Sequence, residues 1–184
     1  MESNFIKSIT NIIKGRSIFL IGMMGSGKST TGPKLAKELK YKFIDLDCLI
    51  ENLAKKPIDQ IFLEDGEDSF RQIETNSLKE IIQIPSMVVS TGGGIITQKE
   101  NWGILRQGIV IWIDLNHEIA IKRLNSQINS RPLLQGENLE KVYYDILNSR
   151  KDLYSQADIR VSINEESTDK VTEKILFELK KNII

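Results

Sequence analysis

The strongest constraint on the fold is a glycine-rich segment at residues 22–30, which reads Gly-Met-Met-Gly-Ser-Gly-Lys-Ser-Thr. An apolar run at residues 18–21 precedes it, and a stretch in which Leu35, Ala36 and Leu39 recur at helical spacing follows it. A strand, a glycine-rich loop and a helix in this order are typical of a nucleotide phosphate-binding loop. The segment therefore predicts a binding site for a nucleoside triphosphate.

Each residue type in this loop suits a task around phosphate. Gly22, Gly25 and Gly27 allow backbone N–H groups to converge on phosphate oxygens. The helix that starts near Lys28 adds unpaired N–H groups and the positive end of its dipole. The Lys28 ammonium can reach the β- and γ-phosphates, and the Ser29 hydroxyl can ligate the accompanying Mg²⁺. We expect the nucleotide to contact Gly25, Ser26, Gly27, Lys28, Ser29 and Thr30.

Composition restricts the class of protein. The chain has 184 residues, 40% of them apolar and 27% charged, as in an ordinary globular domain. Its 25 basic and 25 acidic residues balance, so its charge favours neither nucleic acid nor an anionic membrane. A single cysteine, Cys48, excludes an intramolecular disulfide, and no apolar run is long enough to span a bilayer. We expect a cytoplasmic protein without a nucleic-acid or membrane partner.

Apolar runs alternate with helical periodicity along the chain. We predict strands at residues 17–21, 42–46, 87–91, 109–114 and 159–163. We predict helices at residues 28–40, in two pieces within 48–84, and at 99–106, 117–127, 139–156 and 168–181, the last capped by Ser167. This order predicts an α/β fold, a three-layer α/β/α sandwich around a five-stranded parallel sheet.

Residues 1–16 stand apart from this pattern. Phe5, Ile9, Ile12 and Ile13 recur there at helical spacing. We interpret the segment as a short amphipathic helix that precedes a single domain of residues 17–184. A targeting peptide is the alternative, but the segment has one arginine and no apolar core like that of a secretory signal.

Two carboxylates follow the second predicted strand. Ligands of parallel α/β sheets bind beyond the carboxyl ends of the strands, which is where Asp45 and Asp47 lie. Because they are two residues apart, an extended backbone would turn both side chains to the same side. One could hold Mg²⁺ and the other could accept a proton from a substrate hydroxyl. The alternative is a solvated strand end or a helix N-cap.

Three glycines, Gly92, Gly93 and Gly94, follow the third predicted strand. Glycines at the end of a buried strand lose backbone entropy and add no packing. Close approach of the backbone to a ligand would justify that cost, and a simple tight turn is the alternative.

An arginine and a glutamate share one predicted helix between these motifs. Gly66 ends one helix, and Glu67 and Asp68 favour the start of the next. Arg71 then lies one turn inside this helix, and Glu74 three residues later can orient it. A surface ion pair is the alternative interpretation.

In this order and spacing, the motifs resemble those of the shikimate kinase family over about residues 17–163. The matching segments are the phosphate loop, Asp45-x-Asp47, Phe62-x-x-x-Gly66-Glu67-x-x-Phe70-Arg71-x-x-Glu74, Gly92–Gly94, Arg131-Pro132-Leu133-Leu134 and Arg150-x-x-Leu153-Tyr154. The resemblance implies a phosphate-loop kinase fold with a mobile lid. It also implies transfer of the γ-phosphoryl group of Mg·ATP to the 3-hydroxyl of shikimate, in aromatic amino acid biosynthesis, by a monomer.

The resemblance assigns a role to each matching residue. Lys28, Asp47 and Arg131 are the expected catalytic residues: Asp47 holds the acceptor hydroxyl and can act as its base, and Arg131 closes over the phosphate, which it also binds. Ser29 and Asp45 are the expected Mg²⁺ ligands. Planar guanidinium groups suit the carboxylate of a hydroxy acid. The expected substrate-binding residues are Asp47, Arg71, Gly92, Gly93, Gly94 and Arg150.

Residues 126–137 have the composition expected of the lid, because they are polar and Pro132 interrupts the helical pattern. Lid closure would exclude water, which competes with the substrate hydroxyl for the phosphoryl group. Two positions depart from the family pattern. Leu124 follows Arg123 where many members have a second basic residue, and residues 164–167 are acidic near the usual adenine site. The resemblance therefore does not assign the adenine contacts.

Two other functions fit the phosphate loop. A kinase of the gluconate kinase type would share the fold, but the pair Arg71 and Arg150 with the three glycines favours a shikimate-type pocket. A catalytically silent nucleotide-binding module would be expected to have lost Lys28, Asp47 or Arg131, and all three are present.

Overall fold

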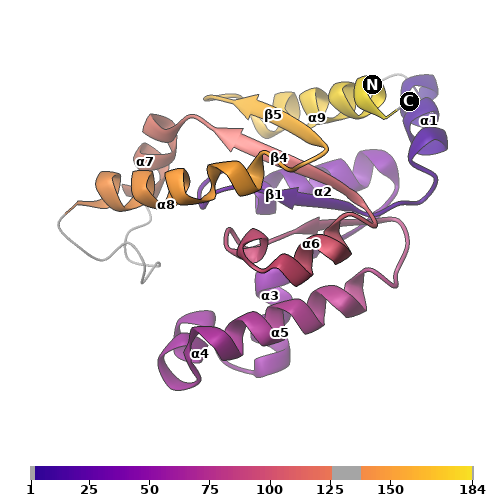
Figure 1. Cartoon of the computed structure of the whole chain (residues 1–184). Coiled ribbons are helices and arrows are strands. Elements are labelled where there is room, and N and C mark those ends of the chain that lie inside the picture. The colour runs from indigo at the N-terminus through magenta and orange to yellow at the C-terminus, as the bar shows by residue number, and fades with distance from the viewer. Residues whose placement is uncertain (1–2, 126–137, 184) are drawn as a thin grey trace.

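The computed structural model describes residues 3–125 and 138–183, and Figure 1 shows their arrangement. The predicted lid at residues 126–137, which includes Arg131, lies outside the described residues. The centre is a parallel sheet of five strands in the order β2-β3-β1-β4-β5. Its strands are β1 (Ile18–Ile21), β2 (Lys42–Asp45), β3 (Met87–Ser90), β4 (Ile109–Leu115) and β5 (Ile159–Ile163). The predicted fold class and all five strands are confirmed.

Burial explains the pattern of apolar and polar residues in each strand. β1 and β3 are buried at every position and have mostly apolar residues, as expected for strands covered on both faces. β5 lies at the edge of the sheet and alternates buried with exposed residues. Leu20 of β1 pairs with Ser90 of β3, so the loops that follow these two strands leave the sheet side by side.

Helices form the two outer layers of the sandwich. α1, α2 and α9 pack together on one face of the sheet, and α6 and α8 lie on the other face (Figure 1). Ser167 caps α9 as predicted, because its Oγ accepts a hydrogen bond from the N–H of Lys170 at 3.4 Å. The bounds are α1 (Ser3–Ile13), α2 (Lys28–Leu39), α6 (Lys99–Leu105), α7 (His117–Asn125), α8 (Leu139–Tyr154) and α9 (Thr168–Asn182), with a 3₁₀ turn, η1 (Ile95–Thr97).

The segment between β2 and β3 contains three helices, so the prediction of two pieces was wrong. They are α3 (Leu46–Ala54), α4 (Ile58–Glu64) and α5 (Gly66–Ile81). α3 ends because Lys55 adopts the left-handed conformation, with φ 55°, and Pro57 then precedes α4. Asp65 lies between α4 and α5, and Gly66, the first residue of α5, has a φ of 82°, which glycine adopts readily.

Within residues 3–125 and 138–183, none of the helices combines the length and the apolar composition that crossing a bilayer requires.

Candidate functional site

A cavity of about 440 Å³ lies at the carboxyl ends of the strands. Residues from three segments line it: the phosphate loop after β1, the start of α3 after β2, and the loop after β3. The lining residues are Met24, Gly25, Ser26, Gly27, Lys28, Ser29, Thr30, Thr31, Asp47, Thr91, Gly92, Gly93, Arg123, Ile163, Glu166, Thr168 and Val171. The structure therefore places the predicted nucleotide residues and part of the predicted substrate pocket around one volume.

The phosphate loop turns directly into α2. Gly27 is the N-cap residue, and its φ of 87° explains why a glycine stands there. Lys28 is 8% exposed, and its ammonium donates to the carbonyl oxygens of Gly22 at 2.8 Å and Met23 at 2.9 Å. It also contacts the Ser26 Oγ at 3.3 Å. The loop thus holds a buried positive charge at the N-terminus of a helix, which suits phosphate.

The two predicted metal ligands lie next to each other. Ser29 Oγ donates to Asp45 Oδ2 at 2.6 Å, which leaves the lone pairs of the hydroxyl available to a cation. The described residues contain no cluster of three or more His, Cys, Asp or Glu side chains that could hold a metal. With Ser29 and Asp45 as its protein ligands, a Mg²⁺ ion here would take its other ligands from phosphate and water, as Mg²⁺ in phosphoryl-transfer sites usually does.

Asp45 and Asp47 reach the site by different means, which corrects the expectation of an extended backbone through both residues. Asp45 ends β2 and caps α3, because its Oδ1 accepts the N–H groups of Asp47 at 3.1 Å and Cys48 at 3.3 Å. Asp47 lies in the first turn of α3. Its carboxylate still lines the cavity, and a Cβ added to Gly92 would lie 2.8 Å from its Oδ1. A side chain at residue 92 would therefore require the Asp47 carboxylate to move.

Arg71 is held by two glutamates on its own helix. Its Nη1 donates to Glu74 Oε2 at 2.8 Å and its Nη2 donates to Glu67 Oε1 at 3.1 Å. The predicted pairing of Arg71 with Glu74 is confirmed, and Glu74 is fully buried rather than part of a surface ion pair. A Cβ at Gly94 would lie 2.7 Å from Arg71 Nη1, so the glycine loop packs directly against this guanidinium.

Arg150 lies beside the same glycine loop as Arg71. A Cβ at Gly93 would lie 3.7 Å from Arg150 Nη1 and 3.6 Å from the Tyr154 hydroxyl. Gly94 faces Arg71 in the same way, so the three-glycine loop lies close to two cationic side chains, one from α5 and one from α8. This arrangement offers two guanidinium groups to one small anion beside the Asp47 carboxylate.

Glu74 has an unusual electrostatic environment. Burial raises the pKa of its carboxyl to about 6, an effect that the Arg71 guanidinium opposes and the Asp47 carboxylate reinforces. Within the described part of the chain, its Oε1 is buried without a hydrogen-bond partner. A Cβ at Gly92 would lie 3.1 Å from that oxygen. Glu74 is therefore a carboxylate that the fold buries in order to hold Arg71.

We predict a pH-dependent cost of burying Glu74. The pKa of this carboxyl is higher in the folded protein than in the unfolded chain. Its contribution to stability is fully present at pH values below the pKa of the unfolded chain, and it is lost as the pH rises through the pKa of the folded protein. Glutamine cannot ionise, so Glu74→Gln avoids this loss. The free energy of unfolding of Glu74→Gln minus that of the parent should therefore rise by about 2 kcal/mol from pH 4.5 to pH 7. Urea denaturation at both pH values measures it.

The matched control for this prediction is Glu67→Gln. Glu67 contacts the same arginine from the same helix, but its side chain is 65% exposed. A difference between parent and Glu74→Gln that stays constant with pH would contradict the assignment of the raised pKa to Glu74.

Sequence reasoning missed three contacts that shape the site. Tyr154 Oη donates to the Gly93 carbonyl at 2.7 Å, Arg123 Nη1 donates to the Gly25 carbonyl at 3.2 Å, and the hydroxyls of Ser29 and Ser90 lie 3.3 Å apart. Only the position of Tyr154 carried a signal, because it follows Arg150 by one helical turn. Arg131 lies outside the described residues, so its place in the site stays a prediction.

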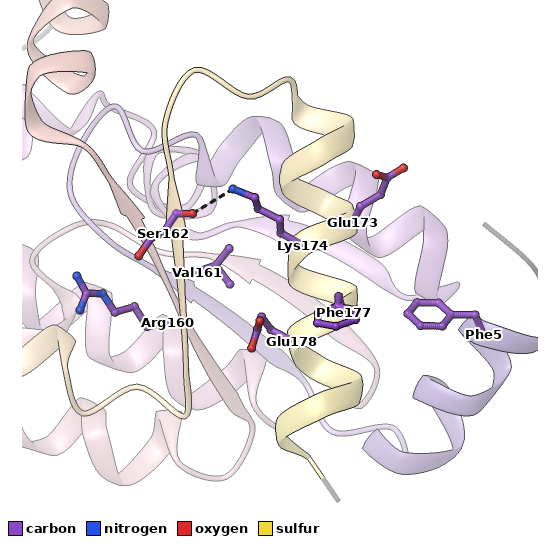
Figure 2. Close-up of a pocket in the computed structure, with 8 residues that line it drawn as sticks. All are labelled: Phe5, Arg160, Val161, Ser162, Glu173, Lys174, Phe177 and Glu178. Carbon is purple, nitrogen blue, oxygen red and sulfur yellow. Dashed lines mark hydrogen bonds between the residues drawn. The ribbon is translucent and has the colours of Figure 1, made fainter.

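A larger cavity, of about 690 Å³, lies elsewhere on the molecule. Figure 2 shows that β5, α9 and Phe5 of α1 surround it. Lys174 reaches from α9 to the Ser162 carbonyl at 3.4 Å, across one end of the space. None of the residues that line this cavity belongs to the phosphate loop or the glycine loop. Its larger volume therefore does not make it the candidate active site.

Comparison with known proteins supports the resemblance seen in the sequence. The family model described as shikimate kinase matches residues 24–180. A shikimate kinase of Prochlorococcus marinus (strain NATL2A) is 48% identical over 178 residues, which cover 97% of this chain and 90% of that protein. The solved structure of shikimate kinase from Acinetobacter baumannii in complex with shikimate is 36% identical, with a TM-score of 0.88, and the match covers 95% of this chain and 98% of that one.

A gluconokinase structure provides a useful contrast. The gluconokinase from Sinorhizobium meliloti is 19% identical, with a TM-score of 0.62, over 92% of this chain and 94% of that one. This likeness shows a common fold alone. The family model and the 48% identical relative decide between the two kinase types. The chain belongs to the shikimate kinase family of ATP-dependent small-molecule kinases.

Proposed function

We propose that this protein transfers the γ-phosphoryl group of Mg·ATP to the 3-hydroxyl of shikimate, giving 3-phosphoshikimate and ADP. The observation that carries the proposal is the arrangement at the carboxyl ends of β1, β2 and β3. There the phosphate loop, the Asp47 carboxylate and the glycine loop line one cavity, and two arginines lie beside the glycine loop. A hydroxy acid that must be phosphorylated requires these three features.

The reaction we propose is an in-line displacement. The substrate hydroxyl oxygen bonds to the γ-phosphorus while the bond from that phosphorus to the β–γ bridging oxygen breaks, and ADP leaves. Asp47 positions the hydroxyl and accepts its proton. Arg71 and Arg150 bind the substrate carboxylate, with the glycines at 92–94 in contact with the acid. Lys28 stabilises the charge on the β- and γ-phosphates, to which residues 25–30 donate.

Mg²⁺ would be held by Ser29, with Asp45 supporting it directly or through water. The bound ion would neutralise phosphate charge during transfer. We place Arg131 on a lid at residues 126–137, from which it would supply a further positive charge to the phosphate. We also propose a cytoplasmic monomer with no nucleic-acid or membrane partner, and the balanced charge supports the proposal that it has neither of these partners.

A coupled ADP-release assay tests the function. The protein is incubated with Mg·ATP alone, with shikimate and with gluconate. ADP release that requires shikimate, with the phosphate located on the 3-hydroxyl by NMR, is the expected result. Equal release without any acceptor would identify an ATPase and overturn the assignment of the acid pocket. ATP binding without turnover would favour the silent nucleotide-binding module.

The two arginines provide a separate prediction. Arg71→Ala or Arg150→Ala should weaken shikimate binding by roughly 10- to 100-fold, because each removes a charge-assisted hydrogen bond to a carboxylate. ATP affinity should stay nearly unchanged, since neither residue lines the cavity around the phosphate loop. Isothermal titration with each ligand separately measures both effects.

Arg106→Ala is the matched control for these variants. Arg106 is an exposed arginine at the end of α6 that contacts Gln156. Loss of ATP affinity equal to the loss of shikimate affinity in the Arg71 and Arg150 variants would contradict their assignment to the acid substrate.

A further inference from the structure

We infer that Tyr154 is a positioning residue for the acid substrate: its buried hydroxyl holds the Gly93 carbonyl and the Arg150 guanidinium in the arrangement that receives the substrate. The inference rests on the proposed function, because it concerns the same pocket. It assigns a role to a side chain that need not touch the substrate itself.

The contacts of the hydroxyl carry the argument. Tyr154 is fully buried, and its Oη donates to the Gly93 carbonyl at 2.7 Å, joining the end of α8 to the loop after β3. The Arg150 guanidinium, one helical turn earlier, lies beside the same hydroxyl and lowers its pKa against the effect of burial. A Cβ at Gly93 would lie 3.6 Å from this hydroxyl and 3.7 Å from Arg150 Nη1, so the oxygen that binds the loop backbone also lies near a cation of the acid pocket.

The ring of Tyr154 is itself held in place. Trp112 of β4 stacks on it, with ring centroids 5.6 Å apart and planes 15° apart. The Arg160 guanidinium lies over Trp112, 4.6 Å from its centroid, and donates to Asp114 Oδ2 at 2.9 Å. A ring fixed from β4 cannot move its hydroxyl without unstacking, so the hydroxyl provides a rigid reference point for the loop.

The protonation state of Tyr154 suits this role. Burial raises the pKa of its hydroxyl to about 12. The group therefore stays a hydrogen-bond donor to Gly93 at every working pH, and its oxygen keeps lone pairs for a donor such as arginine. The hydrogen bond from Tyr154 to Gly93 therefore does not depend on pH.

Removal of the hydroxyl should affect the acid substrate selectively. Tyr154→Phe keeps the stacked ring but releases the Gly93 carbonyl and leaves Arg150 without its neighbour. A loosely held guanidinium binds a carboxylate more weakly in the ground state and the transition state alike, which raises KM and spares kcat. We expect KM for shikimate to rise about tenfold, with kcat and KM for ATP within about twofold of the parent.

The experiment compares steady-state kinetics of the parent, Tyr154→Phe, Arg150→Ala and the double variant. Because Tyr154 acts partly through Arg150, the double variant should raise KM for shikimate by less than the product of the two single effects. Tyr41→Phe is the matched control, since it removes a buried hydroxyl just before β2, at the opposite end of the sheet. Thermal melts check that every variant folds.

Three results would overturn the inference. The first is an unchanged KM for shikimate in Tyr154→Phe, and the second is an equal rise in KM for both substrates, which would indicate a merely structural role. The third is multiplicative effects in the double variant, which would show that Tyr154 does not act through Arg150. Failure of the parent protein to phosphorylate shikimate is seen before any variant is made, and it would overturn the proposed function together with this inference.

Discussion

Asp47→Asn is expected to lower kcat by about 10³-fold while ATP binds with nearly its original affinity. The amide keeps the size of the side chain and its place in the first turn of α3, beside Gly92. It cannot accept the proton of the substrate hydroxyl, and it places no negative charge beside the attacking oxygen. Steady-state kinetics gives kcat, and isothermal titration gives the dissociation constant for ATP.

The control for this variant is Asp68→Asn. Asp68 also lies in the first turn of a helix, α5, but it is exposed and does not line the cavity. The same amide change there should leave kcat within about twofold of the parent. Loss of ATP affinity in Asp47→Asn as large as the loss of kcat would contradict a role confined to the acceptor hydroxyl.

The sequence predicted the sheet well because local and global signals agree there. β1 and β3 are short, continuous apolar runs, which is what a strand covered on both faces requires. The phosphate loop was equally readable, because glycine spacing and the lysine depend on local backbone geometry. Arg71 and Glu74 were paired correctly since they are three residues apart on one helix.

The errors have two physical causes, one local and one long-range. A helix start competes with a strand end at Asp45, and the side chain decides the competition by accepting two backbone N–H groups. The backbone at Asp47 is therefore helical and not extended as expected. Contacts between distant residues were equally hidden, such as that of Tyr154 with Gly93, which are 61 positions apart. Periodicity carries no information about which helix reaches which loop.

The phosphate loop itself leads to the last expected result: Lys28→Met should lower kcat/KM for ATP by about 10³-fold or more. The ammonium is buried and bonded to two loop carbonyls and the Ser26 hydroxyl. Methionine has a similar length and fills the space, but it brings no charge to the β- and γ-phosphates. Lys28→Arg should not rescue activity, because a bulky planar guanidinium does not fit where a compact ammonium is enclosed.

Lys37→Met is the matched control, because Lys37 is exposed on the same helix, α2, near its C-terminal end. The measurements are steady-state kinetics with ATP varied at saturating shikimate, and titrations of the protein with ADP and with ATP. Together they distinguish loss of the Lys28 charge from loss of the phosphate-loop conformation. If the charge is responsible, ATP binding should suffer more than ADP binding, since only ATP has the γ-phosphate that the ammonium can reach. A Lys28→Met protein that retains kcat/KM within about tenfold of the parent would show that Lys28 holds the loop but does not act on the transferred group.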